Sequence, residues 1–183
     1  VKTIIPLNSL PTPSGNYTVG TTSFSLIDKS RLEWFTKSDS TDFRKIMIQI
    51  WYPSNDNPME ESLPYIDNIE SRISAISHQI ELPKYLIKQI NYINTHTYDK
   101  LSISENSHPV ILFSHGLGGM RVQNSSYIQE LVSHGYIVVA MDHTYDANVT
   151  IFPDDIICNY KSALPDSKKT DTEALEYRIK QLN

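Results

Sequence analysis

Residues 114–119, Ser-His-Gly-Leu-Gly-Gly, have the composition of a tight turn with exposed backbone amides. Such amides stabilise the negative charge on an ester oxygen as the carbon becomes tetrahedral, and loss of one donor costs about 3 kcal/mol. Glycines on both sides of Leu117 let its N–H face inward while its side chain packs elsewhere. We therefore assign the N–H of Leu117 as an oxyanion donor and expect His115, Gly116 and Gly118 to surround the bound group.

The glycine loop also admits two alternative roles. Glycines between a strand and a helix often form a turn with no further role. Glycine loops that open helices also bind phosphate. However, the chain has neither a G-x-G-x-x-G sequence nor the glycine pattern of a P-loop, and the acidic Asp142 follows the next strand. A phosphate site is therefore the weaker alternative.

Hydroxyl, imidazole and carboxylate groups near the loop suggest a nucleophile with its base. Ser114 directly precedes His115, but neighbours on an extended strand point to opposite faces, so we do not expect them to bond to each other. We predict instead that His115 holds the loop by hydrogen bonding. Asp142 and His143 are placed at the end of a strand, near the mouth of the site at most, and Tyr145 is a candidate wall of an acyl pocket.

The other residues of catalytic type form no recognisable site. Cys158 is the only cysteine, so no disulfide can form within the chain, and a single cysteine is usually a small packed side chain. Four scattered histidines lack the short spacings of a metal site: His78, His96, His108 and His134. We predict no metal and no cofactor.

The elements that would position the loop lie within residues 109–143. An unbroken apolar run at 110–113 predicts a parallel strand covered on both faces. Residues 126–134 have a capping-box start, an apolar stripe and a glycine stop, which predict a helix. A second apolar strand follows at 136–140. In such a βαβ unit the glycine loop lies at the carboxyl end of the first strand, where the sites of parallel sheets gather.

The chain before this unit has three parts. Residues 1–20 are rich in Pro, Ser, Asn and Gly and are predicted to form an extended arm. Alternating apolar residues at 45–52 predict a strand, with 21–27 as its antiparallel neighbour. Residues 55–107 have the character of an insertion or cap-like segment, with a candidate helix at 82–93.

After the unit, residues 148–167 are predicted to form a loop or a small hairpin, and helical spacing returns from residue 171. The 183 residues fit a single domain. A formal net charge of −5 argues against nucleic acid as a partner. No apolar run approaches the roughly 20 residues of a membrane span, and the start at Val1 suggests a processed or trimmed chain whose compartment is unknown.

Four separated motifs, taken together, are more specific than one glycine loop. They are Tyr-Thr-Val-Gly-Thr at 17–21 with Pro13, Trp-Tyr-Pro-Ser at 51–54, Phe-Ser-His-Gly-Leu-Gly-Gly at 113–119, and Ser-His-Gly-Tyr-Ile-Val-Val-Ala at 133–140 followed by Asp142 and His143. In this order and spacing they resemble the platelet-activating-factor acetylhydrolase family, especially its bacterial members. The resemblance runs from about residue 11 to the chain end and is weak at 55–107.

The resemblance implies an α/β-hydrolase fold, of which this chain would form the incomplete amino-terminal part: a mixed, mostly parallel sheet flanked by helices. It implies a metal-free esterase whose Ser, Asp and His triad removes short or oxidised acyl groups from phospholipids, so the expected partner is a small-molecule or phospholipid ester. It also gives Leu117 the role of an oxyanion amide. The family's nucleophile lies in a Gly-His-Ser-x-Gly elbow, after a long helix that residues 173–183 would begin.

No G-x-S-x-G sequence occurs in the chain, and the triad of such hydrolases follows the order Ser, acid, His. We therefore expect the whole triad beyond Asn183, which excludes Asp142 and His143 as its acid and base and leaves the chain inactive alone. The alternative is a truncated, non-catalytic relative that binds lipid or acyl ligands. Peripheral membrane contact through the aromatic residues Tyr85, Tyr92, Trp34 and Trp51 is a further option, although core or surface packing is the preferred role.

Overall fold

A five-stranded mixed sheet forms the centre of the computed structural model, which describes residues 9–36, 38–161 and 179. The strand order is β3-β1-β2-β5-β4. The β1–β2 and β2–β5 pairs are antiparallel, whereas β1–β3 and β4–β5 are parallel. The strands are β1 (Thr18–Leu32), β2 (Phe43–Ser54), β3 (Thr97–Asp99), β4 (Val110–Ser114) and β5 (Ile137–Asp142).

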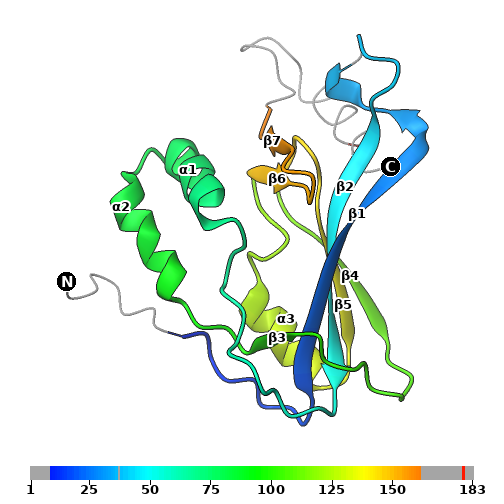
Figure 1. Cartoon of the computed structure of the whole chain (residues 1–183), viewed down its shortest axis with the longest axis vertical. Helices are drawn as coiled ribbons and strands as arrows, with labels where there is room; N and C mark the ends of the chain where they lie inside the picture. The colour runs from blue at the N-terminus through cyan, green and yellow to red at the C-terminus, as the bar shows by residue number, and fades with distance from the viewer. Residues whose placement is uncertain (1–8, 37, 162–178, 180–183) are drawn as a thin grey trace.

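Short helices and one small hairpin complete the described part (Figure 1). The hairpin of β6 and β7 lies beside α1 in the view, above the carboxyl ends of β4 and β5. These elements are η1 (Trp34–Thr36), α1 (Ile69–Ile80), α2 (Lys84–Ile87), η2 (Lys88–Tyr92), α3 (Ser125–Ser133), β6 (Val149–Ile151) and β7 (Ile157–Asn159).

The predicted strand, helix and strand around the glycine loop are present as β4, α3 and β5. Helix α3 begins and ends one residue before the predicted range of 126–134. Its apolar face, with Ile128 and Val132, packs on Trp51 of β2 and on Val138 and Ala140 of β5 in the main core. The local pattern of apolar residues is therefore sufficient to place this unit.

The expectation that the first strand is covered on both faces is wrong for the described residues. Val110 is 59% exposed and Leu112 is 72% exposed, while Ile111 and Phe113 pack against the core. Strand β4 lies at the edge of the sheet, and only the face that carries α3 is covered. An apolar run shows that a strand is suited to burial but does not show which segments cover it.

The antiparallel pair predicted at 21–27 and 45–52 is confirmed and is longer than expected. Strands β1 and β2 pair from Thr18 opposite Ser54 to Leu32 opposite Phe43, with an irregularity after Asp28. Before β1, the described part of the predicted arm is held against the end of α3, since the N–H of Tyr17 donates to the carbonyl of Ser133 at 3.0 Å.

The helix prediction for 82–93 is wrong in form, because α2 and η2 share this stretch as two short pieces. Helix α1 was not predicted, although Ile69, Ile73, Ile76 and Ile80 recur on one helical face. The predicted loop or small hairpin after residue 148 contains β6 and β7. The helix predicted from residue 171 lies outside the described residues, apart from Ile179. No helix of the described part is both long and apolar enough to cross a membrane.

Candidate active site

The glycine loop leaves the carboxyl end of β4 and is tied by backbone hydrogen bonds to the segment that follows β5. The N–H of Gly118 donates to the carbonyl of Asp146 at 2.9 Å, and the N–H of Asn148 donates to the carbonyl of Gly119 at 2.8 Å. Gly118 has a φ of 67°, in the left-handed region that favours glycine. The loop is therefore a fixed structure.

The orientation of the Leu117 amide follows from the peptide group it shares with Gly116. The carbonyl of Gly116 accepts two hydrogen bonds, from the N–H of Gly119 at 2.9 Å and from Nδ1 of His115 at 2.7 Å. In a planar trans peptide the next N–H points opposite to the carbonyl. No hydrogen bond among the described residues uses the N–H of Leu117, and this residue is 51% exposed. The Leu117 N–H is therefore fixed in direction and has no hydrogen-bond partner among the described residues.

His115 uses both of its ring nitrogens inside the protein. Nδ1 faces the carbonyl of Gly116, which only accepts, so Nδ1 carries the proton. Nε2 accepts from the backbone N–H of His143 at 3.1 Å. The side chain is buried, with 6% exposed. These contacts define a neutral imidazole that fastens the glycine loop to the end of β5.

Ser114 bonds to His143, a contact that the spacing of the two residues in the sequence did not indicate. Its Oγ lies 2.7 Å from Nε2 of His143. Parallel pairing sets Ser114 opposite Met141, so the residues that follow the two strands meet at one edge. Burial is the largest cause that lowers the pKa of His143 from 6.5 to about 4, so the imidazole is neutral at neutral pH.

No carboxylate of the described residues bonds to the His143 ring, so the pair lacks the acid of a Ser-His-Asp triad. Asp142, the adjacent residue, points into the interior and is fully buried rather than near the mouth of a site. Its carboxylate accepts from the backbone N–H of Arg121 at 2.7 Å and binds the guanidinium of the same residue. It also lies 3.2 Å from Nη2 of Arg72.

Two arginines and two aspartates form one ion cluster, Asp67, Arg72, Arg121 and Asp142, in which only the Asp67 side chain is partly exposed. Asp67 lies 2.5 Å from Nε of Arg72 and 2.6 Å from Nη2 of Arg121. Burial alone would raise the pKa of Asp67, but the charges of both arginines outweigh it and hold that pKa below its usual value. The cluster joins α1, the end of the glycine loop and the end of β5.

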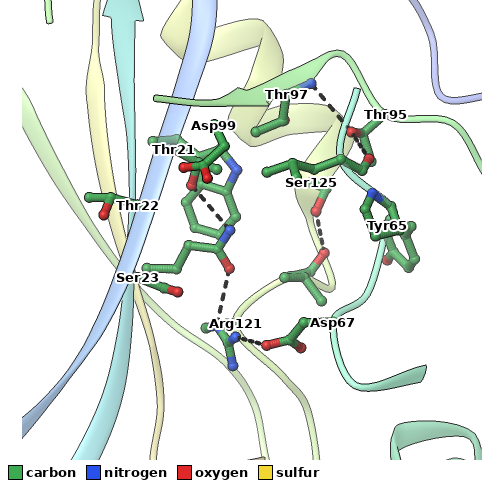
Figure 2. Close-up of a pocket in the computed structure, with 15 residues that line it drawn as sticks. Thr21, Thr22, Ser23, Tyr65, Asp67, Thr95, Thr97, Asp99, Arg121 and Ser125 are labelled. Carbon is green, nitrogen blue, oxygen red and sulfur yellow. Dashed lines mark hydrogen bonds and ion pairs between the residues drawn. The ribbon is translucent and has the colours of Figure 1, made fainter. Parts of the chain in front are cut away.

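A cavity lined in part by Arg121 lies between β1, β3 and the start of α3 (Figure 2). It has a volume of about 350 Å³. The figure shows Arg121 bound to Asp67 at one end of this cavity and joined through Gln49 to Thr21 of β1. Each nitrogen of the Arg121 guanidinium thereby has a partner within the protein.

Comparison with known proteins assigns the family. The family model of platelet-activating factor acetylhydrolase, isoform II, matches residues 4–182. The chain belongs to this family. It is 29% identical over 140 residues to the platelet-activating factor acetylhydrolase of Cavia porcellus. The aligned residues cover 74% of this chain and 29% of that protein. It is 26% identical over 139 residues to the enzyme of the same name from Canis lupus familiaris, covering 73% of the chain and 28% of that protein.

A solved ferulic acid esterase from Streptomyces cinnamoneus has the same fold, with a TM-score of 0.73 and 26% identity. The match covers 96% of this chain and 47% of that esterase. The chain thus has an α/β-hydrolase fold. It spans less than a third of the length of the two acetylhydrolases it matches.

In this acetylhydrolase-family fold, helix α1 reaches the glycine loop through Gln79. Its Nε2 donates to the carbonyl of Gly118 at 3.2 Å, and its Oε1 accepts from the amide of Asn148. A Cβ atom at Gly118 would lie 2.3 Å from Nε2 of Gln79, so a side chain there would displace the Gln79 amide. Nothing in the sequence alone linked these distant residues.

Tyr145 lines a separate cavity of about 330 Å³, whose apolar part includes Phe43, Phe152 and Ile156. Its ring centroid is 4.8 Å from that of Phe35. Burial, more than any other cause, raises the pKa of its hydroxyl. The role of Tyr145 in an acyl pocket stays a prediction, as do the binding roles of His115, Gly116 and Gly118. Among the described residues, no group of His, Cys, Asp or Glu is placed to hold a metal.

Proposed function

We propose that this chain is the amino-terminal part of a serine carboxylic-ester hydrolase in which the N–H of Leu117 stabilises the oxyanion. The observation that carries the proposal is the pinned Gly116 carbonyl, which orients a Leu117 amide that has no partner among the described residues. Membership of the acetylhydrolase family supports the same chemistry.

The reaction would transfer the acyl group of an ester to a serine located after Asn183, and then to water. As that serine attacks, the carbonyl oxygen gains negative charge and accepts from the N–H of Leu117. Because His115 and Gly119 already fix the peptide, no reorganisation is needed at this step. The second oxyanion amide would follow the nucleophile, as in other α/β-hydrolases.

The free edge of β4 supports this position for the nucleophile. Within the described residues β4 pairs only with β5, and its other edge is unpaired. Val110 and Leu112 are also exposed, on the face of β4 that no described segment covers. A strand that carries the elbow and pairs with this edge would bring its serine to the carboxyl end of β4, beside the glycine loop.

The family indicates the class of substrate. Both similar curated proteins are named platelet-activating factor acetylhydrolases. We therefore propose a short-acyl ester, either a small molecule or a phospholipid of that type, as the substrate, and lipid breakdown as the setting.

The decisive experiment is to read the gene beyond the codon for Asn183 and to assay the product of the whole open frame on p-nitrophenyl acetate and on a short-acyl phospholipid. We expect a Gly-x-Ser-x-Gly sequence, a later Asp and His, and loss of hydrolysis when that Ser is replaced by Ala. A stop codon directly after Asn183, or hydrolysis by residues 1–183 alone, would overturn the proposal.

A further inference from the structure

A cavity of about 710 Å³ lies between α1 and the segment that contains β6 and β7, which are neighbours in Figure 1. This volume lies in the range of about 300–1,000 Å³ that small-molecule sites occupy. No residue of the ion cluster, the Ser114–His143 pair or the glycine loop lines it. The cavity is therefore separate from the groups that take part in the proposed reaction.

The cavity adjoins the glycine loop through two of its lining residues. Gln79 donates to the carbonyl of Gly118, and the N–H of Asn148 donates to the carbonyl of Gly119. A ligand in the cavity would therefore lie within one residue's reach of the loop that carries Leu117. A part of an ester beyond the reacting carbonyl could extend from the loop into this cavity.

Polar groups without partners gather around this cavity. The side-chain oxygen Oδ1 of Asn148 is buried and accepts no hydrogen bond, although the residue is only 3% exposed. Five further polar side chains of the lining make no hydrogen bond to another described residue: Ser71, Ser74, His78, Asn159 and Tyr160. These five side chains are partly or fully exposed, so solvent can reach them. Because buried polar groups are nearly always paired, it is the buried Oδ1 of Asn148 that points to a ligand.

The charge of the lining narrows the class of ligand. The described lining residues include no Lys, Arg, Asp or Glu, so the one side chain of the lining that could offer a positive charge to a phosphate is His78. Its apolar members are Ala75 and Ile157, too few to enclose a long acyl chain. Hydroxyl and amide groups of this kind suit a neutral ligand that carries several hydroxyls.

We infer that this cavity binds the uncharged, polyhydroxylated alcohol part of the ester, such as a glycerol or sugar unit. The inference rests on the proposed function and specifies its substrate. The acyl carbonyl would meet the N–H of Leu117, while the hydroxyls of the alcohol part bond to Asn148, Ser74 and Tyr160.

The binding test uses residues 1–183, because it needs no catalysis. The ¹⁵N-labelled chain is titrated with glycerol and with methyl glucoside, and separately with glycerol 3-phosphate and 1-butanol. We expect saturable amide shifts for one or both neutral polyols, confined to residues 71–79, 148 and 157–160. Tighter binding of the phosphate or of the alkanol at these residues, or unsaturable shifts, would overturn the inference.

Variants separate this site from general polyol effects. Ser74→Ala and Tyr160→Phe each remove one hydroxyl from the lining, and each should weaken polyol binding about fivefold, the effect of one hydrogen bond. Ser23→Ala, which removes an exposed hydroxyl from the other cavity, is the matched control and should bind as the parent does. Unchanged affinity in both lining variants, with circular dichroism showing a folded chain, would exclude the site.

Kinetics on the product of the whole open frame distinguish the two proposals. Glycerol monoacetate should have a higher kcat/KM than butyl acetate, and Tyr160→Phe should reduce that preference. Ester hydrolysis without polyol binding would overturn the inference alone. Polyol binding without any ester hydrolysis would overturn the proposed function and with it the assignment of the ligand as an alcohol part.

Discussion

The loops that follow β4 and β5 lie side by side, yet their polar groups are satisfied to different degrees. At the end of β5, the carboxylate of Asp142 is fully buried and binds the guanidinium groups of Arg72 and Arg121. In the loop after β4, the N–H of Leu117 is oriented by its neighbours and has no partner among the described residues.

This difference shows how a fold can separate support from binding. A buried polar group with all its partners inside the protein is committed to stability, whereas a fixed group without a partner is available to a substrate. Arg121 connects the two loops, because it follows the glycine loop and binds Asp142. The ion pairs of Asp142 at the end of β5 therefore anchor the glycine loop that carries the Leu117 N–H.

The largest expected effect is the loss of the supporting cluster. Asp142→Ala leaves two buried guanidinium groups without this carboxylate, so the free energy of unfolding should fall by about 3–5 kcal/mol. Urea denaturation followed by circular dichroism measures it. Asp154→Asn, which removes a carboxylate from an exposed pair with Lys45, is the control and should change stability little. Equal losses of stability in the two variants would contradict the supporting role of the buried Asp142 carboxylate.

The open loop is tested by removing the backbone donor itself. In the product of the whole open frame, Leu117→Pro deletes the N–H, and kcat should fall by about 100- to 1,000-fold. Leu117→Ala keeps the N–H and should retain most of kcat. Thermal unfolding of both variants checks that the fold is intact. Similar losses in the two variants would show that the side chain, and not the amide, matters.

The next effect is a pH dependence of the free energy of unfolding, which arises from His143 after β5. Folding lowers the pKa of His143 from 6.5 to about 4, mainly by burial, so the unfolded chain binds the proton more readily. The free energy of unfolding should therefore decrease as the pH falls, by about 2 kcal/mol between pH 7 and pH 5. His143→Gln should lose this dependence, and His78→Gln, at an exposed residue, should keep it. An unchanged slope in His143→Gln would assign the dependence to other groups.

Much of the fold near the site could be predicted, because its signals are local. The apolar run of β4 and the glycine stop after α3 depend on neighbouring residues alone, and α3 was placed within one residue. Helix α1 was missed although its isoleucines have helical spacing, since Ser and Ile are weak helix formers. The exposure of Leu112 could not be predicted, because it depends on which segments cover β4.

Only part of the site could be predicted from the sequence. The roles of Leu117 and His115 follow from adjacent glycines, and they stay predictions. The contacts that hold the loop join residues far apart: Ser114 and His143 are 29 positions apart, Gln79 and Gly118 are 39 apart, and Arg72 and Asp142 are 70 apart. Only the register of the strands and the packing of α1 bring them together.

The smallest effect concerns the contact within the glycine loop that orients the Leu117 amide. His115→Ala removes the donor to the Gly116 carbonyl and should lower kcat about tenfold with little change in KM. The reason is that the Leu117 N–H remains present but is no longer held in its orientation. His115→Asn can restore an N–H near the position of Nδ1 and should recover most of kcat. A merely structural role predicts that both variants lose stability together and that Asn gives no rescue. Rescue of kcat without rescue of stability would place the role of His115 in orienting the oxyanion donor.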